Sequence, residues 1–256
     1  MARADRTGRT RPARTVVAGE PGRGRDARTR WITLTAVALT AGTGGIDVVS
    51  FTRLGGVFTS VMTGNIVLLG LSIARASGTL AGHTALALAC YVAGVAVAAR
   101  VIGPARREHP AGNGMAWPAR VNVVLGAELL LLAGLAAGWE LTGGHPPAAD
   151  QYLLQGIAAV AMGMQSAAVR GLGAGNFSTT YLTGQLTGLA SSVVTPGKPR
   201  WPGWQQAGPL LALIGGAVLS GVLIAEAPAA VPVITFAPLA GVLAAELATR
   251  LRPAGR

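Results

Sequence analysis

The chain has 256 residues, of which 51% are hydrophobic and only 12% are charged. Because an ordinary soluble domain carries about 25% charged residues, this composition excludes a soluble globular protein and predicts a polytopic helical membrane protein. The formal net charge of +11 does not indicate a nucleic-acid partner, since the basic residues gather in the first 30 positions and beside apolar segments, where they set membrane topology.

Residues 1–30 are arginine-rich and lack apolar periodicity, so we expect a disordered cytoplasmic tail in front of one membrane domain at 31–250. Eight apolar blocks follow the tail. Their ranges are 31–50, 56–74, 79–102, 119–139, 151–170, 177–194, 207–225 and 232–249.

Eight full spans would place as many Lys and Arg residues outside as inside, which contradicts the positive-inside rule. If the blocks at 56–74 and 177–194 instead enter and leave on one side, six spans remain, and ten basic residues lie on the cytoplasmic side against two outside. This distribution predicts an all-α bundle of six spans with two broken or re-entrant segments and a cytoplasmic N-terminus.

The two broken segments carry similar polar motifs. Thr59-Ser60 and Thr63-Gly64-Asn65 in the first match Thr179-Thr180 and Thr183-Gly184-Gln185 in the second, with the same internal spacing. The halves at 31–140 and 150–250 would then be inverted repeats, an arrangement that brings broken helices together around a solute in transporters.

Asp47 near the end of the first block is the strongest single candidate for a functional residue, because a carboxylate within a membrane segment is costly. It could couple a proton or cation to transport, or it could be a helix-end residue that is paired with Arg53 or hydrated at the membrane interface. We expect its partner to be Ser50, Arg53 or the polar core. The candidate solute-binding residues are Asp47, Ser50, Thr59, Thr63, Asn65, Gln165, Ser166, Thr180, Thr183 and Gln185.

Glu128 is a second candidate coupling carboxylate, since its neighbours are aliphatic and it needs a buried partner. Glu246 lies four residues before Arg250, and this spacing predicts an ion pair at a helix end. Against the binding hypothesis, the Thr and Gly residues of the two motifs could serve helix packing alone.

Catalytic and metal-binding patterns are missing from the sequence. Cys90 is the single cysteine, and the three histidines, His83, His109 and His145, are far apart, at segment ends or in loops where we expect them to be solvated. Because no phosphate-binding loop or nucleophile triad occurs either, we expect neither an enzyme nor a metal or cofactor.

Two stretches resemble a known family. Gly45 to Phe51 with Leu54 to Asn65, and Gly163 to Arg170 with Thr179 to Gly184, are similar to the two signatures of the YoaK-type family of bacterial integral membrane proteins. The resemblance covers roughly 31–250 and implies an inner-membrane bundle of about six or more helices. The family usually has Asn where this chain has Ser166, which weakens any role that needs an amide there.

Two functions fit these observations. The first is a small secondary transporter or permease for a small polar solute. The second is a membrane module without transport activity that packs with itself, as a homo-oligomer, or with a partner through its Gly/Thr helix faces. A cavity flanked by the two polar breaks would favour the first, and continuous tight packing would favour the second.

Overall fold

The computed structural model describes residues 22–103, 117–172, 182–194 and 203–251, and in these ranges the chain forms helices and no strand. The helices are α1 (Gly22–Arg53), α2 (Met62–Ala74), α3 (Gly78–Ile102), α4 (Ala119–Leu141), α5 (Ala148–Gly171), α6 (Leu182–Val194), α7 (Gly203–Glu226), the 3-10 turn η1 (Pro228–Ala230) and α8 (Val231–Leu251). α1 begins nine residues before the predicted block, so residues 22–30 of the expected disordered tail are helical, because each added residue extends an existing helix by one hydrogen bond. The rest of that tail lies outside the described residues.

Six segments in the described ranges are long and apolar enough to cross a membrane. They are Thr29–Arg53, Gly78–Ile102, Ala119–Leu141, Ala148–Gly171, Ala207–Glu226 and Pro228–Leu251. Large apolar side chains such as Leu130 and Leu211 are exposed on their outer faces, as a lipid-facing surface requires. The prediction of an all-α bundle with six spans is therefore confirmed.

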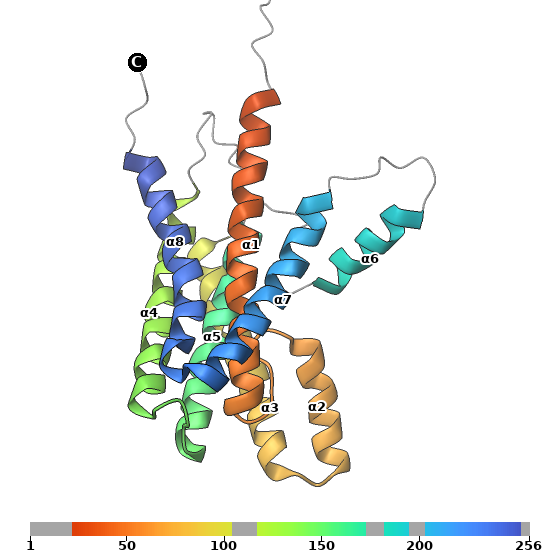
Figure 1. The fold of residues 1–256 in the computed structure, drawn as a ribbon, viewed down its shortest axis with the longest axis vertical. Helices are drawn as coiled ribbons and strands as arrows, with labels where there is room; N and C mark the ends of the chain where they lie inside the picture. The colour runs from red at the N-terminus through yellow and green to blue at the C-terminus, as the bar shows by residue number, and fades with distance from the viewer. Residues whose placement is uncertain (1–21, 104–116, 173–181, 195–202, 252–256) are drawn as a thin grey trace, which may run out of the picture.

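The two Thr-Gly segments form the short helices α2 and α6. Each has 13 residues, which gives a length of about 20 Å at 1.5 Å per residue, too short for a hydrocarbon core of about 30 Å. Figure 1 shows α2 beside the end of the bundle where α1 ends and α3 begins, and α6 directed toward the opposite end. Neither segment adds a full span.

α1 and α7 approach closely where two glycines replace side chains. A Cβ added at Gly44 would lie 2.2 Å from the carbonyl oxygen of Leu213, and one at Gly216 would lie 1.9 Å from the carbonyl oxygen of Ala41. Small residues at membrane helix crossings allow such contact between backbones. Any side chain at these glycines would push the two helices apart.

α3 and α5 cross in the same way. A Cβ at Gly94 would lie 2.2 Å from the carbonyl oxygen of Val160, and one at Gly163 would lie 2.2 Å from that of Tyr91. Within each crossing, every glycine lies three residues after the residue whose carbonyl its partner helix contacts. The α1–α7 and α3–α5 crossings therefore share one pattern of contacts.

α4 and α8 complete the bundle beside α5 and α1 (Figure 1). α4 turns a stripe of residues inward that includes Leu125, Glu128 and Leu132. Trp139 near its end is 2% exposed and donates its indole N–H to the carbonyl of Pro228 at 2.8 Å. Its ring therefore joins two helix ends within the protein.

Candidate functional site

The chain between α1 and α2 is non-helical at residues 54–61. It turns at Gly55 and Gly56, whose φ angles of +99° and +76° are left-handed and unfavourable for any residue with a side chain. Leu54 and Val57 are fully buried on either side of this turn. The turn sends the chain back into the bundle before α2 begins, and it exposes backbone N–H and carbonyl groups that lipid cannot satisfy.

Asp47 satisfies the turn's free N–H groups. Its Oδ1 accepts hydrogen bonds from the Thr59 N–H at 2.8 Å, the Thr59 hydroxyl at 3.0 Å and the Ser60 N–H at 2.9 Å, while its Oδ2 accepts one from the Ser60 hydroxyl at 2.5 Å. Asp47 is 6% exposed. The predicted site residues Asp47 and Thr59 are therefore together with Ser60, but four protein donors already occupy the carboxylate.

Within the described residues, Asp47 forms no hydrogen bond or ion pair with either of the partners expected in its own helix, Arg53 and Ser50. Arg53 forms no ion pair with it there, and the buried Ser50 hydroxyl has no hydrogen-bond partner among the residues that the structure describes. The interpretation of Asp47 as a helix-end residue paired with Arg53 is wrong in this structure, because the turn returns Thr59 and Ser60 to the carboxylate instead.

Asn65 holds the other side of the same turn. Its Oδ1 accepts the Phe58 N–H at 2.9 Å and its Nδ2 donates to the Phe58 carbonyl at 2.6 Å. Phe58 also stacks on Phe51 at the end of α1, with ring centroids 5.0 Å apart. Because an amide supplies a donor and an acceptor together, Asn65 satisfies both polar groups of one backbone residue.

A histidine in α3 supports the turn from a third direction, contrary to the expectation of solvated histidines. His83 is 2% exposed, its ring nitrogen bonds the side-chain amide of Gln155, and Gln155 donates back to the His83 carbonyl at 2.6 Å. The ring stacks on Tyr152, with centroids 3.8 Å apart. A Cβ at Gly55 would lie 2.3 Å from the His83 ring, so the ring and the turn fit against each other.

The other two histidines give no further site. His145 is exposed between α4 and α5, as predicted, with its Nδ1 3.0 Å from the Gly143 carbonyl oxygen. His109 lies outside the described residues. No group of three His, Cys, Asp or Glu residues that could hold a metal ion occurs in the ranges the structure describes.

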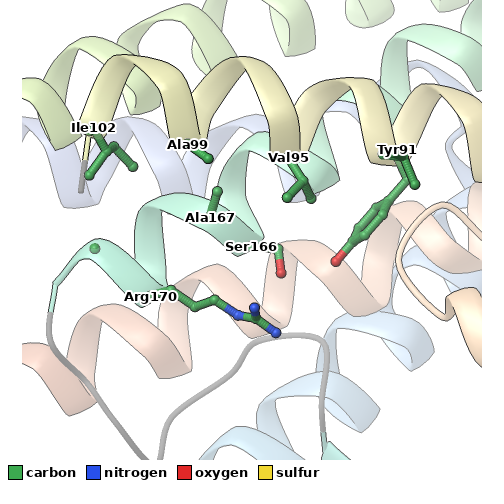
Figure 2. Close-up of a pocket in the computed structure, with 10 residues that line it drawn as sticks. Tyr91, Val95, Ala99, Ile102, Ser166, Ala167 and Arg170 are labelled. Atoms are coloured by element: carbon green, nitrogen blue, oxygen red, sulfur yellow. The ribbon is translucent and has the colours of Figure 1, made fainter. Parts of the chain in front are cut away.

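A cavity of about 460 Å³ lies between α3 and α5, near the end of the bundle where both helices finish. Figure 2 shows the hydroxyl groups of Tyr91 and Ser166 and the guanidinium of Arg170 gathered on one side of it. The remaining lining is formed by Val92, Val95, Ala99, Ile102, Gly103, Ala167 and Gly171. Of the predicted residues that the structure describes, only Ser166 lines this cavity.

Gln165 connects α5 to α1 beside the cavity. Its Nε2 donates to the Thr43 hydroxyl at 2.8 Å, and Thr43 lies one helical turn before Asp47. Thr43 in turn donates to the Leu39 carbonyl of its own helix. The predicted residues Gln165, Ser166 and Asp47 are thus carried by two neighbouring helices, but no hydrogen bond described for Asp47 involves α5.

The second Thr-Gly segment is placed differently from the first. Thr183 is exposed on α6, and the Gln185 Oε1 is buried with no hydrogen-bond partner among the described residues. Thr63, on the first segment, is exposed on α2. Thr180 lies outside the described residues. The two motifs therefore do not meet in one cluster of described side chains.

The two carboxylates on α4 and α8 differ sharply. Glu246 accepts hydrogen bonds from the Trp117 N–H at 3.0 Å and from the Arg250 Nε at 2.9 Å, which confirms the predicted ion pair. Glu128 is equally buried, at 0% exposure, but neither of its oxygens has a hydrogen-bond partner among the residues that the structure describes. The expected partner of Glu128 is therefore missing from these residues.

Sequence reasoning missed Tyr91, Arg170 and His83 as parts of these sites. Tyr91 and His83 lie on α3, an apolar helix without a polar motif, and Arg170 was expected to set topology and to end a family signature, not to line a cavity. A sharper signal was present in the sequence, since Arg170 lies four residues, about one helical turn, after Ser166.

Comparison with known proteins agrees with this architecture. The sequence profile of the family described as "Protein of unknown function (DUF1275)" matches residues 35–245. The chain is also similar to the UPF0700 transmembrane protein YoaK of Bacillus subtilis (strain 168), with 32% identity over 160 residues. This match covers 62% of the chain and 65% of the relative, so the chain spans slightly less than two thirds of the curated relative's length.

No solved structure matches the chain. The family match extends from α1 into α8 and includes the turn, both short helices and the cavity. With six apolar helices of spanning length and a transmembrane relative at 32% identity, the chain is a multi-pass membrane protein that belongs to the DUF1275 family, to which the YoaK-type resemblance pointed.

Proposed function

We propose that this protein is a small secondary transporter or permease for a small polar solute. The cavity between α3 and α5 is the observation that carries the proposal, although none of its described lining residues belongs to either polar break. Its volume of about 460 Å³ lies within the range of about 300–1,000 Å³ that small-molecule pockets occupy. Its lining is largely apolar with a few polar groups on one side, which is the usual composition of such pockets.

We infer that the solute path is built from two inverted halves, at about 31–140 and 150–250. The matched glycine crossings support this division, because α1 and α3 of one half pair with α7 and α5 of the other through the same contacts. Gly44 precedes Asp47 by three residues, as Gly163 precedes Ser166. Asp47 and Ser166 are therefore corresponding positions, at opposite ends of the bundle.

The two corresponding positions differ in a way that suits alternating access. The turn at 54–61 is bonded to the Asp47 carboxylate, and the cavity lies toward the opposite end of the bundle, where α3 and α5 finish. We propose that the described arrangement is open toward the ends of α3 and α5 and closed toward the end of α1. In this proposal Asp47 holds the closed side, and Glu128 is the remaining candidate for coupling.

We propose a bacterial cytoplasmic membrane as the location, with the N-terminus inside. The arginine-rich first 30 residues and the Arg100, Arg120 and Arg170 side chains would then lie on the cytoplasmic side. The cavity would open to the cytoplasm. This proposal assigns the protein no catalytic chemistry and no cofactor.

Cysteine accessibility tests the transport proposal. In a Cys90→Ser background, Ala167→Cys places a thiol in the cavity, and Leu132→Cys, at 1% exposure on α4, is the buried control. We expect a membrane-impermeant thiol reagent to label position 167 from one side of sealed vesicles and not to label position 132. Absence of labelling at 167 from both sides would remove the water-filled path on which the proposal depends.

A packing module remains the second candidate, supported by the surface of α6. Gly184, Thr187 and Gly188 are exposed there, and nothing within 4 Å would meet a Cβ added at Gly188. Because small residues favour helix association in membranes, this face could bind a second copy. Gly188→Leu should then reduce the oligomer mass measured in detergent, whereas Gly70→Leu on α2 should not.

A further inference from the structure

We propose that the cavity between α3 and α5 binds an anion with a short alkyl tail, whose carboxylate or phosphate head faces Arg170 and Tyr91. This inference rests on the proposed function, because it names the class of solute that the transport cavity would take. The sequence predicts only a small polar solute, whereas this inference specifies a negative charge and an alkyl tail for that solute.

We infer the negative charge of the ligand from the residues that line the cavity. Arg170 is the one charged residue among the ten described residues that line the cavity, and these ten include neither Asp nor Glu. Within the described ranges Arg170 forms no ion pair. A guanidinium offers several N–H donors in a planar fork that matches a carboxylate or phosphate, so an anion gains charge-assisted hydrogen bonds that a neutral or cationic solute lacks.

The position of the hydroxyl groups adds to the head-group site. In Figure 2 the Tyr91 and Ser166 oxygens and the Arg170 guanidinium come together on one side of the cavity. The Tyr91 hydroxyl can donate a hydrogen bond to an anionic oxygen. Ser166 is 7% exposed and stands on the turn of α5 directly before Arg170. One anion could therefore contact side chains of both helices.

We infer the alkyl tail of the ligand from the apolar part of the cavity wall. Val95, Ala99, Ile102 and Ala167 contribute only hydrocarbon to the cavity, and they lie together between α3 and α5 in Figure 2. Burying an alkyl chain there is favourable by about 0.8 kcal/mol per CH₂ group. An inorganic anion would leave this apolar wall unfilled, so a head with a tail fits the cavity better.

Two sources could supply this chemistry, a free organic acid or the head of an anionic lipid. Val92 on the cavity wall is 64% exposed, so the cavity reaches the lipid-facing surface of α3. The test therefore contains one arm for each source, and both arms depend on Arg170.

The first arm uses the full chain in nanodiscs of zwitterionic phosphatidylcholine and measures binding by titration calorimetry. The probes are butyrate, the neutral butyramide and the cationic butylammonium. We expect butyrate to bind at least tenfold more tightly than the other two, Arg170→Gln to weaken butyrate binding at least tenfold, and Arg170→Lys to weaken it less. Arg100→Gln is the matched control, because Arg100 is exposed near the same end of α3 but does not line the cavity.

The second arm repeats the measurement in nanodiscs that contain phosphatidylglycerol. If the natural ligand is a lipid head, this lipid should compete with butyrate in the wild type and lose that effect in Arg170→Gln. Equal binding of butyrate and butyramide, or equal loss in Arg170→Gln and Arg100→Gln, would overturn the proposal.

Uptake by proteoliposomes separates this inference from the proposed function. If butyrate binds in an Arg170-dependent way but is not taken up, the anion site is supported and the transport proposal is wrong. If butyramide is taken up but butyrate does not bind in an Arg170-dependent way, the transport proposal is supported and the anion site is wrong.

Discussion

At the scale of single residues, the bundle stabilises two buried carboxylates with hydrogen-bond donors of the protein and leaves a third without any described donor. Asp47 is bonded by a backbone turn, Glu246 by Arg250 and the Trp117 N–H, and Glu128 by none of the described residues. A buried carboxylate costs several kcal/mol unless donors or charges compensate it. Replacing each of the three carboxylates should therefore change the free energy of unfolding differently.

Asp47→Ala should destabilise the protein strongly. The substitution leaves the N–H groups of Thr59 and Ser60 without their acceptor, and each buried unsatisfied group costs about 1–3 kcal/mol. We expect a clear fall in the thermal unfolding temperature, measured in detergent by fluorescence-detected gel filtration. Glu140→Ala, at an exposed position on α4, is the control and should leave the temperature unchanged. An equal temperature for both variants would mean that Asp47 does not hold the turn.

Glu128→Leu and Glu246→Leu form a matched pair with opposite expectations. Glu128→Leu removes a buried carboxylate that has no described hydrogen bond, so stability should stay the same or rise. Glu246→Leu removes the acceptor of the Trp117 N–H and of Arg250, so stability should fall by about 1–3 kcal/mol. Thermal unfolding of the two variants checks the order. A larger loss for Glu128→Leu would show that Glu128 has a partner essential for the fold.

At the scale of elements, glycine determines which helices can cross. α1 with α7 and α3 with α5 meet backbone to backbone at Gly44, Gly216, Gly94 and Gly163. Hydropathy alone predicts the helices but not these pairs, because α1 and α7 are remote in sequence and a glycine in an apolar block gives no sign of its neighbour. The glycine-rich face of α6, in contrast, is exposed in the described structure.

Gly216→Ala and Gly215→Ala compare a crossing glycine with its neighbour in α7. A Cβ at 216 would meet the Ala41 carbonyl at 1.9 Å, whereas one at 215 would meet nothing within 4 Å. We expect Gly216→Ala to cost about 1–3 kcal/mol through overpacking, and Gly215→Ala to be neutral or to gain up to about 1 kcal/mol in helix propensity. Unfolding in detergent measures both, and equal behaviour would contradict the close crossing.

At the scale of the whole molecule, the positive charges and the short helices determine the order of the spans. The sequence was sufficient for six spans and for two segments that do not cross, because charge asymmetry and hydropathy act on long stretches. The sequence was not sufficient to predict how the candidate site is assembled. Asp47 and Thr59 were both identified as candidates, but the contact of Asp47 with Thr59 and Ser60 depends on a turn with two left-handed glycines. The cavity was not identified, because Tyr91 carries no motif and meets Ser166 only through the crossing of α3 and α5.

Thiol labelling of loops tests the topology as a whole. In a Cys90→Ser background, His145→Cys between α4 and α5 and Ala227→Cys after α7 should react from the outside of intact cells. Ala119→Cys at the start of α4 should react only after the membrane is permeabilised, because one span separates it from position 145. Reaction of positions 119 and 145 from the same side would contradict the proposed order of spans.

The hydrogen bonds between Asp47 and the following turn also matter while the chain is being made. About 150 residues separate the end of α1 from the start of α7, its glycine-matched neighbour, and at 5–20 residues per second the ribosome needs roughly 8 to 30 s to make them. During that interval α1 would sit in the membrane with a carboxylate and without α7. Thr59 and Ser60 follow Asp47 by only 12 and 13 residues, so the nascent chain can cover the charge within seconds of producing it.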